Sequence, residues 1–356
     1  MSGADMLTGG IIGFGNIAAE GHVPGYRYCR GARIVAAFDP DESRAKALEG
    51  SLPDARFFSD IDEFFEKNSF DFVDIATPPA FHAPYIIQAL ERGLHVLCEK
   101  PLVLDLDQLE AIRGLSRAKG RVVFTVHNWR HSPVIKEVSR LLSGKDEEGL
   151  GRIRRIRYEV IRMRPSVAVG EGSGQADGPD NWRLDPAVAG GGILVDHGWH
   201  AFYIVNGWLG GEPRWVEGRL ENRKFKEIAV EDTAEVTFGY PDGAVAELFF
   251  TWAGDERRNS IAIEADGGRR MLVLDDHIVC EEAGPGGCGR KVLKSFSEGL
   301  SHGSHHPDWY GAVVQEFLDE VQGRTRPGRN LIQASSCLKM LLGAAEAAKS
   351  GRRIEL

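Results

Sequence analysis

Short apolar runs alternate with amphipathic segments along the first third of the chain. The apolar runs predict strands near residues 9–12, 32–40, 70–77, 94–100 and 121–128. Segments 83–93 and 106–120 predict helices, the first with Pro84 near its start and Gly93 past its end. Strands and helices that alternate at this length predict a doubly wound parallel sheet, in which ligands bind outside the carboxyl ends of the strands.

The pattern changes after His127. Two strand pairs are predicted at 233–252 and 259–276, around the turns Pro241 to Gly243 and Asp266 to Gly268. The basic run 152–164 interleaves apolar residues at strand spacing, which is typical of a strand with one solvated face. Helices are predicted at 307–323 and 330–351. We therefore expect an α+β region with a large, mainly antiparallel sheet that has one face on helices and one face open.

Composition narrows the class of protein. The 356 residues are enough for two domains, and 42% apolar with 27% charged residues is ordinary for a soluble globular protein. A net charge of −9 argues against a nucleic-acid partner. Five scattered cysteines without a CxxC pair and an N-terminus without a secretory pattern predict a cytoplasmic protein. No apolar run approaches the roughly 20 residues of a membrane span, so no membrane partner is expected.

A glycine-rich turn follows the first predicted strand. Gly13, Gly15 and Ala18 form the pattern G-x-G-x-x-A, in which the glycines allow a tight turn and a close approach of backbone to a pyrophosphate. Asp39 ends the second strand at the spacing of an acidic residue that binds the adenosine ribose. Because a carboxylate repels a 2′-phosphate, NAD is predicted in preference to NADP, and Arg44 is interpreted as a solvated helix residue.

Two further groups of residues end strands on the same side of the predicted sheet. Thr77, Pro78 and His82 follow one strand, and Glu99 and Lys100 follow the next. A buried charge is costly unless it is paired, so a lysine between two apolar runs is unexpected at a purely structural strand end. The shared position predicts that both groups face a ligand.

A second charged pair lies in the later part of the chain. Asp196 and His200 are four residues apart, after the glycines 190–192, which predict a close approach of another group to the backbone. On a helix they would be neighbours, and a carboxylate beside an imidazole suits general acid–base chemistry, although a structural pair explains the spacing equally well. The histidines of segment 302–306 crowd into a Gly/Ser loop without an acidic or cysteine partner, so no metal site is predicted. The glycine-rich segment 170–181 is a candidate lid or a plain connection.

Together these pieces resemble the Gfo/Idh/MocA family, which is named for glucose–fructose oxidoreductase, inositol dehydrogenase and a rhizopine-catabolism protein. The resemblance covers nearly the whole chain and rests on GFGNIA, ATPPAFH, CEKPL, HNWRHSP, WRLDP and GGGILVDHGWH. The EKP element, followed about 90 residues later by GGGxxxDxGxH, is specific for the family. It implies a dinucleotide-binding Rossmann domain at 1–127 and a substrate-binding and oligomerisation domain at 128–356.

The resemblance also implies a function, namely an NAD(P)-dependent dehydrogenase that acts on a sugar, an inositol or a related polyol as a homodimer or homotetramer. It implies catalytic roles for Lys100, Asp196 and His200. The implied cofactor contacts are Gly13, Gly15, Asn16, Ile17, Asp39, Thr77, Pro78, His82, Glu99 and Lys100. The implied substrate contacts are Lys100, Arg130, Trp182, Arg183, Asp196 and His200.

Other interpretations stay open at this point. The same cofactor could serve a redox-neutral glycosidase, or the chain could be a non-catalytic NAD-binding regulator. Trp129, Trp182 and Trp199 are candidates to stack on a sugar, and Arg130 and Arg183 are candidates to pair with a carboxylate or phosphate. The apolar segments VTFGY and AELFFTW predict an apolar open sheet face that is covered in an oligomer.

Overall fold

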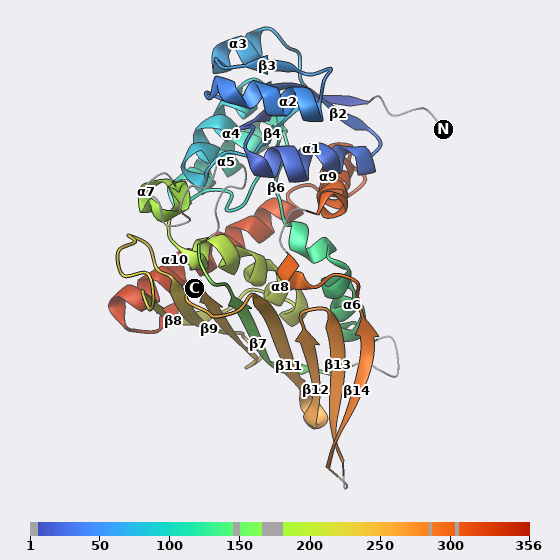
Figure 1. Ribbon diagram of the computed structural model, residues 1–356, viewed down its shortest axis with the longest axis vertical. Coiled ribbons are helices and arrows are strands. Elements are labelled where there is room, and N and C mark those ends of the chain that lie inside the picture. The colour runs from blue at the N-terminus through green and yellow to red at the C-terminus, as the bar shows by residue number, and fades with distance from the viewer. Residues whose placement is uncertain (1–5, 145–149, 166–180, 285–286, 303–305) are drawn as a thin grey trace. The chain divides into compact units, whose positions relative to one another are not determined.

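The computed structural model describes residues 6–144, 150–165, 181–284, 287–302 and 306–356 (Figure 1). The candidate lid at 170–181 lies outside these residues except for Asn181. The described chain divides into two compact units. The first comprises residues 6–128 and 306–338, and the second comprises the described residues between 129 and 302 together with 339–356. Each unit is described by itself.

The first unit contains a six-stranded sheet with the order β3-β2-β1-β4-β5-β6, and all of its strand pairs are parallel. Its strands are β1 (Leu7–Ile12), β2 (Ala32–Phe38), β3 (Arg56–Phe58), β4 (Phe72–Ile75), β5 (His95–Cys98) and β6 (Val123–Thr125). The predicted doubly wound parallel sheet is confirmed. The short edge strand β3 was not predicted.

Helical segments connect these strands. They are η1 (Ala18–His22), α1 (Val23–Gly25), η2 (Tyr26–Tyr28), η3 (Glu42–Arg44), α2 (Ala45–Ser51), α3 (Ile61–Glu66), η4 (Pro79–Phe81), α4 (His82–Glu91) and α5 (Leu106–Lys119). The late helix α9 (Pro307–Val321) also belongs to this unit. Its buried residues Val313 and Phe317 share one hydrophobic core with Ile11 and Phe72 of the sheet. The segments η5 (Asn128–His131) and α10 (Arg329–Ser350) contribute residues to both units.

The second unit contains a nine-stranded sheet with the order β14-β13-β12-β11-β7-β10-β9-β8-β15. The strands are β7 (Ile153–Ile161), β8 (Trp215–Glu221), β9 (Thr233–Gly239), β10 (Val245–Thr251), β11 (Arg258–Ala265), β12 (Arg269–Leu274), β13 (His277–Gly284), β14 (Gly287–Ser295) and β15 (Ile354–Glu355). The β7–β10 pair is parallel and the other pairs are antiparallel. The mainly antiparallel sheet and both predicted hairpins are confirmed.

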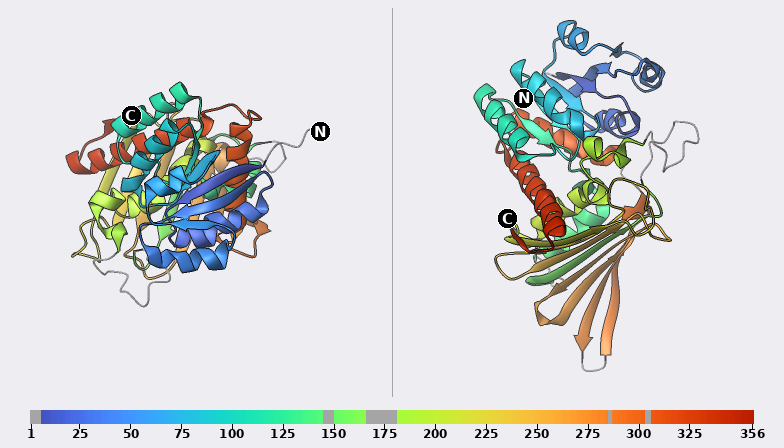
Figure 2. Two further views of the ribbon diagram at one scale, coloured as in Figure 1. Left: turned by 90° about the horizontal axis from the view of Figure 1, so that it is seen from above. Right: turned by 90° about the vertical axis from the view of Figure 1, so that its left-hand side faces the viewer.

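Helices of the second unit lie on one face of this sheet (Figure 2). They include α6 (Pro133–Leu142) and α8 (Trp199–Leu209), and Phe202 of α8 meets Phe238 of β9 edge to face at 5.4 Å. The shorter helical segments are η6 (Trp182–Leu184), α7 (Pro186–Ala189), η7 (Leu194–Gly198), η8 (Asp266–Gly268) and η9 (Leu300–His302). None of the helices in the described ranges is long and apolar enough to cross a membrane.

The apolar residues that suggested an apolar open face mostly lie on the covered face. Val236, Phe238, Leu248 and Phe250 are at most 2% exposed, and of the bulky residues in these segments only Phe249 stays partly exposed on the open side. Successive strand residues alternate between faces, so the open face receives the charged residues in between. These form ion pairs across strands, such as Arg157–Glu247 at 2.6 Å. The expectation of a large apolar patch was therefore wrong.

Candidate functional site

The glycine-rich turn has the shape that a dinucleotide requires. Gly13 has φ +88°, and a Cβ there would lie 2.8 Å from the Thr77 side chain, so only glycine fits. A Cβ at Gly15 would meet nothing within 4 Å, which leaves space beside the backbone. Asp39 accepts a hydrogen bond of 2.7 Å from the Phe14 amide, so its carboxylate lies next to the turn. The residues therefore fit a pyrophosphate beside Gly15 and a ribose at Asp39.

The predicted residues after β4 and β5 lie at neighbouring strand ends, because these strands pair in parallel. His82 joins the two loops, since its ring nitrogens lie 2.8 Å from the carbonyl oxygens of Thr77 and Pro101. Burial lowers the pKa of His82, whereas its contacts with the Thr77 and Pro101 carbonyl groups act in the opposite direction. The Lys100–Pro101 peptide bond is cis. The first unit thus gathers the turn, Asp39, His82 and Lys100 at one edge of its sheet.

A buried network that the sequence did not predict lies behind Lys100. His22 Nδ1 is 2.9 Å from both carboxylate oxygens of Asp74, and His22 Nε2 is 3.0 Å from Glu99 Oε1. Tyr26 donates to Asp74 at 2.9 Å, and Tyr310 of α9 donates to Glu99 at 3.0 Å. His22 and Asp74 are 1% and 0% exposed. Because both ring nitrogens face carboxylates, His22 is an imidazolium.

The network fixes the backbone at Lys100. Burial alone would lower the pKa of His22, but the carboxylates of Asp74 and Glu99 raise it to about 10. Burial would likewise raise the pKa of Glu99, yet His22 and Lys100 hold it below its usual value. The second oxygen of Glu99 accepts the Lys100 amide at 2.9 Å. Glu99 is therefore a charged support for the strand end that carries Lys100.

In the second unit, the three glycines 190–192 lead into η7, which carries Asp196. A Cβ at Gly192 would lie 2.0 Å from the carbonyl oxygen of Glu231, so a glycine is required there. The Glu231 carboxylate accepts the amides of Gly192 at 2.9 Å and Leu194 at 3.0 Å. The close approach that the glycines predicted is therefore to Glu231, which holds the start of η7.

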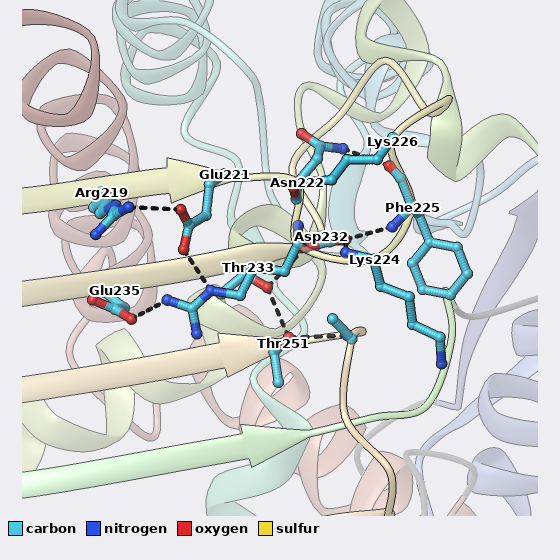
Figure 3. A network of polar contacts seen from close by, with 12 residues as sticks. Arg219, Glu221, Asn222, Lys224, Phe225, Lys226, Asp232, Thr233, Glu235 and Thr251 are labelled. Carbon is cyan, nitrogen blue, oxygen red and sulfur yellow. Dashed lines mark hydrogen bonds and ion pairs between the residues drawn. The ribbon is translucent and has the colours of Figure 1, made fainter.

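The next residue, Asp232, anchors this support (Figure 3). Its carboxylate accepts the amides of Arg223, Lys224 and Phe225, each at 2.8 Å, and the hydroxyl of Thr233. Burial would raise the pKa of Asp232, but these hydrogen bonds lower it. The loop around 223–225 and the start of β9 are thereby tied together beside Glu231.

His200 lies in α8 between two aromatic side chains. Its ring stacks on Trp129, with centroids 4.7 Å apart, and its Nδ1 lies 2.9 Å from the Tyr203 hydroxyl. That hydroxyl also accepts the Trp129 amide at 3.0 Å. Asp196 Oδ2 is 3.6 Å from the neighbouring His197. Tyr203, three residues after His200 on the same helix, thus contacts the ring of His200, and the sequence did not predict this contact.

The remaining predicted residues divide by burial. Trp129 and Trp199 are at most 1% exposed, so they pack inside the protein and cannot offer a ring to a sugar from the surface. Trp182 is partly exposed, and the Arg183 guanidinium lies 4.3 Å from its ring centre. Arg130 is also partly exposed. Trp182 therefore remains the one candidate of the three tryptophans for stacking on a sugar.

Two negative observations concern the described residues. No group of three or more His, Cys, Asp or Glu within them is arranged to hold a metal ion. A hollow of 660 Å³ lies at the ends of β7 and β10 and is lined by the strand residues Ile161 and Phe249. Their strand neighbours lie on the helix-covered face, so Ile161 and Phe249 lie on the open face of the sheet. That hollow therefore opens away from the face on which α8 and His200 pack.

Comparison with known proteins identifies the family. Residues 7–127 match the model of an oxidoreductase family with an NAD-binding Rossmann fold, GFO/IDH/MocA, and residues 142–271 match the C-terminal domain of the same family. The chain belongs to the GFO/IDH/MocA family. It is therefore an oxidoreductase with an NAD-binding domain, as the sequence motifs indicated.

Relatives of the GFO/IDH/MocA family match over the full length. D-xylose 1-dehydrogenase (NADP(+)) 2 of Haloferax volcanii is 24% identical over 98% of this chain and 99% of its own. The structure of GenD2 from gentamicin A biosynthesis, in complex with NAD, has a TM-score of 0.79 at 23% identity and covers 99% of this chain and 97% of its own. Levoglucosan dehydrogenase in complex with NADH has a TM-score of 0.82 at 18% identity and covers 99% of both chains. At these identities the two structures establish the fold alone.

Removing the Tyr203 hydroxyl is expected to alter the pH dependence of turnover. When the Tyr203 oxygen accepts a hydrogen bond from the Nδ1 proton of His200, it stabilises the protonated form of the His200 ring, and Nε2 is left to take up a proton. Tyr203→Phe should lower kcat about tenfold, the cost of one buried hydrogen bond, and move the acid limb of the kcat profile to lower pH. The measurement is kcat against pH on a verified substrate. Tyr240→Phe, which removes another buried hydroxyl bonded to α8, should leave that profile unchanged. Identical profiles for the two variants would contradict the role of Tyr203.

Proposed function

We propose that the protein is an NAD-dependent dehydrogenase that transfers a hydride between nicotinamide and a hydroxyl-bearing carbon of a sugar, an inositol or a related polyol. The observation that carries this proposal is the position of Lys100. It follows β5 at the same sheet edge as the glycine turn and Asp39, on a backbone fixed by buried Glu99. A lysine held beside a nicotinamide site is placed to hydrogen-bond the reacting oxygen of a substrate and to stabilise its negative charge.

The remaining roles belong to the second unit. We propose that His200 takes the hydroxyl proton at Nε2 while Tyr203 holds Nδ1, and that Asp196 favours the protonated ring by its charge. Lys100 hydrogen-bonds the same substrate oxygen and stabilises its developing negative charge. Bound NAD supplies the hydride acceptor. Sugar dehydrogenases among the relatives, for D-xylose and for levoglucosan, support the substrate class.

A two-stage screen tests this function. Thermal unfolding with saturating NAD is measured over inositols, hexoses, uronates and sugar phosphates, because a ligand that binds the folded state raises Tm. Each compound that raises Tm is then incubated with NAD, and NADH is followed by absorbance. We expect net NADH formation from at least one of them. Sugar release from glycosides without net NADH would instead identify a redox-neutral glycosidase.

Cofactor choice should favour NAD over NADP. The Asp39 carboxylate accepts hydrogen bonds from a ribose diol and repels a 2′-phosphate, while Arg44 lies 3.4 Å from Asp41 and is engaged there. We expect NAD to bind about 10- to 100-fold more tightly, the worth of charge-assisted hydrogen bonds. Asp39→Asn should reduce the difference between the affinities for NAD and NADP by improving NADP binding. Arg44→Ala should leave this difference unchanged. Calorimetric titration with both cofactors is the test, and tighter NADP binding by the wild type would overturn the assignment.

We also propose that the protein self-associates as a dimer or tetramer through the open sheet face. The support is the row of cross-strand charges there, such as Arg258 with Glu159 at 3.5 Å and Arg157 with Glu247 at 2.6 Å. A second copy could meet this row with complementary charges. Light scattering at micromolar concentration should return at least twice 39.1 kDa, and the association should weaken as salt rises. A monomer mass at low salt would refute it.

A further inference from the structure

Arg162 is a buried cation without a carboxylate partner in the described part of the chain. It follows β7 on the face that α8 covers, in register with the buried residues Tyr158 and Val160, and is 3% exposed. Its amide donates to the Thr251 carbonyl and its carbonyl accepts the Gly254 amide, so its backbone is held between strand ends. Burying a guanidinium is costly unless its charge and its donors are satisfied.

Only one side of the guanidinium is satisfied. Nη1 donates to the carbonyl oxygens of Ile161 and Arg258, at 2.8 and 3.2 Å, and to Asn259 Oδ1 at 3.0 Å. Nε and Nη2 have no hydrogen-bond partner among the described residues. The Nε/Nη2 edge is one of the two-donor edges with which arginine grips both oxygens of a carboxylate or phosphate. The buried side that lacks a partner among the described residues is therefore a two-donor edge of the kind that binds an oxyanion.

The surroundings add donors and positive charge. Within the described residues, the Tyr158 hydroxyl and Asn259 Nδ2 are also buried without a partner. The pKa of Arg162 is lowered to about 10, chiefly by burial and also by the nearby Arg257, whereas Tyr158, Asp196 and Asp275 act in the opposite direction. Asp275 already uses both carboxylate oxygens, which accept the amide and hydroxyl of Ser301. Within the described part of the chain neither arginine forms an ion pair, although the charges of Asp275 and Asp196 raise the pKa of both.

This cluster lies near the proposed catalytic residues of the same unit. Arg162 is bonded to the end of β10, and η7, which carries Asp196, packs against β10. Helix α8, which carries His200, packs against β7. The pKa of Arg257 responds to the Asp196 carboxylate as well, although burial and Asp275 affect it more. An anion held by Arg162 would thus sit close to Asp196.

We propose that the Nε/Nη2 edge of Arg162 binds an oxyanion group of the substrate, so that the preferred substrate is an acidic or phosphorylated sugar or polyol rather than a neutral one. The inference rests on the proposed dehydrogenase function for its setting. Arg162 binds the oxyanion through two parallel hydrogen bonds, Tyr158 and Asn259 offer further donors, and Arg257 adds positive charge. The reacting hydroxyl group lies elsewhere on the same substrate.

Binding of matched sugar pairs tests the inference without requiring turnover. Calorimetry with NAD-saturated protein compares D-glucuronate and D-glucose 6-phosphate with D-glucose, and D-galacturonate with D-galactose, at equal ionic strength. We expect at least one anion to bind about 10- to 100-fold more tightly than its neutral parent, the gain of a charge-assisted two-donor contact. The uronate and phosphate arms distinguish the two oxyanions. No preference for any anion over its parent would overturn the inference.

Variants assign the preference to Arg162. Arg162→Gln should abolish the preference for anions. Arg162→Lys keeps the charge but loses the two-donor edge of the guanidinium, so it should retain only part of this preference. The matched control is Arg155→Gln on the same strand, which removes an arginine from the open face where Arg155 pairs with Glu247 at 3.4 Å. An anion preference that survives Arg162→Lys undiminished would refute the two-donor contact, even if Arg162→Gln fails to fold. NADH formation from neutral sugars alone would support the dehydrogenase function and contradict the anion subsite. Tight anion binding through Arg162 without NADH formation would support the anion subsite and contradict the dehydrogenase function.

Discussion

Lys100→Met is expected to lower kcat by about 10²- to 10⁴-fold, the usual contribution of a positioned acid–base or electrostatic group. The ammonium of Lys100 is proposed to contact the reacting oxygen, and methionine keeps the length of the side chain without charge or donor. His200→Ala should have an effect of the same order, because the hydroxyl proton then lacks its acceptor. NAD binding should change little in either variant, since Asp39 and the glycine turn are untouched.

The measurement is single-turnover and steady-state NADH formation, with NAD affinity determined separately by calorimetry. Lys119→Met at the exposed end of α5 is the matched control, and it should turn over at the wild-type rate. A large loss of kcat with unchanged NAD affinity supports a role in the reaction. Wild-type rates in both Lys100→Met and His200→Ala would mean that Lys100 is only a structural residue at a strand end and that His200 is only a packed core residue.

The sequence predicted those site residues whose signal is local. Gly13 and Gly15 follow a strand, in a glycine pattern that gains its meaning from the alternating strands and helices around it, and Asp39 and Lys100 each end a strand of a parallel sheet. The carboxyl ends of such strands share one edge, so their common location followed without any knowledge of side-chain contacts. The glycines before η7 likewise predicted a close approach, although not its partner, Glu231.

Residues whose role depends on distant partners were missed. His22 meets Asp74 and Glu99 across 52 and 77 positions, and no spacing rule connects them. A signal was present in Asp74, the one charged residue inside the buried strand FVDI. Arg162 was hidden within a basic run that was interpreted as the solvated face of a strand. Strand alternation places Arg157 outward and Arg162 on the covered face, so the period of two within that run was informative.

The buried imidazolium of His22 should dominate the stability of the first unit. Removing one partner from a buried, hydrogen-bonded charge cluster leaves the other charges uncompensated and typically costs about 3–5 kcal/mol. His22→Leu should therefore lower the free energy of unfolding by about that amount in a denaturant titration. Tyr310→Phe, which removes one hydrogen bond to Glu99, should cost about 1 kcal/mol. His277→Leu, which removes a partly exposed histidine that meets Asp276 at 2.7 Å, should cost less than about 1 kcal/mol.

The pH dependence of unfolding gives the same network a signature that loss of packing cannot imitate. The pKa of His22 is raised to about 10 in the folded protein from 6.5 in the unfolded chain, so the folded state holds a proton that the unfolded state releases. The stabilisation is complete below pH 6.5 and is lost as the pH rises towards 10, with a slope of up to about 1.4 kcal/mol per pH unit. The difference between wild-type and His22→Leu unfolding free energies should accordingly shrink across this window, while the difference between wild type and His277→Leu stays small throughout. A wild-type minus His22→Leu difference that is constant from pH 6.5 to 10 would mean that His22 is neutral, and Glu99 would then lose its role as a charge-fixed support for Lys100.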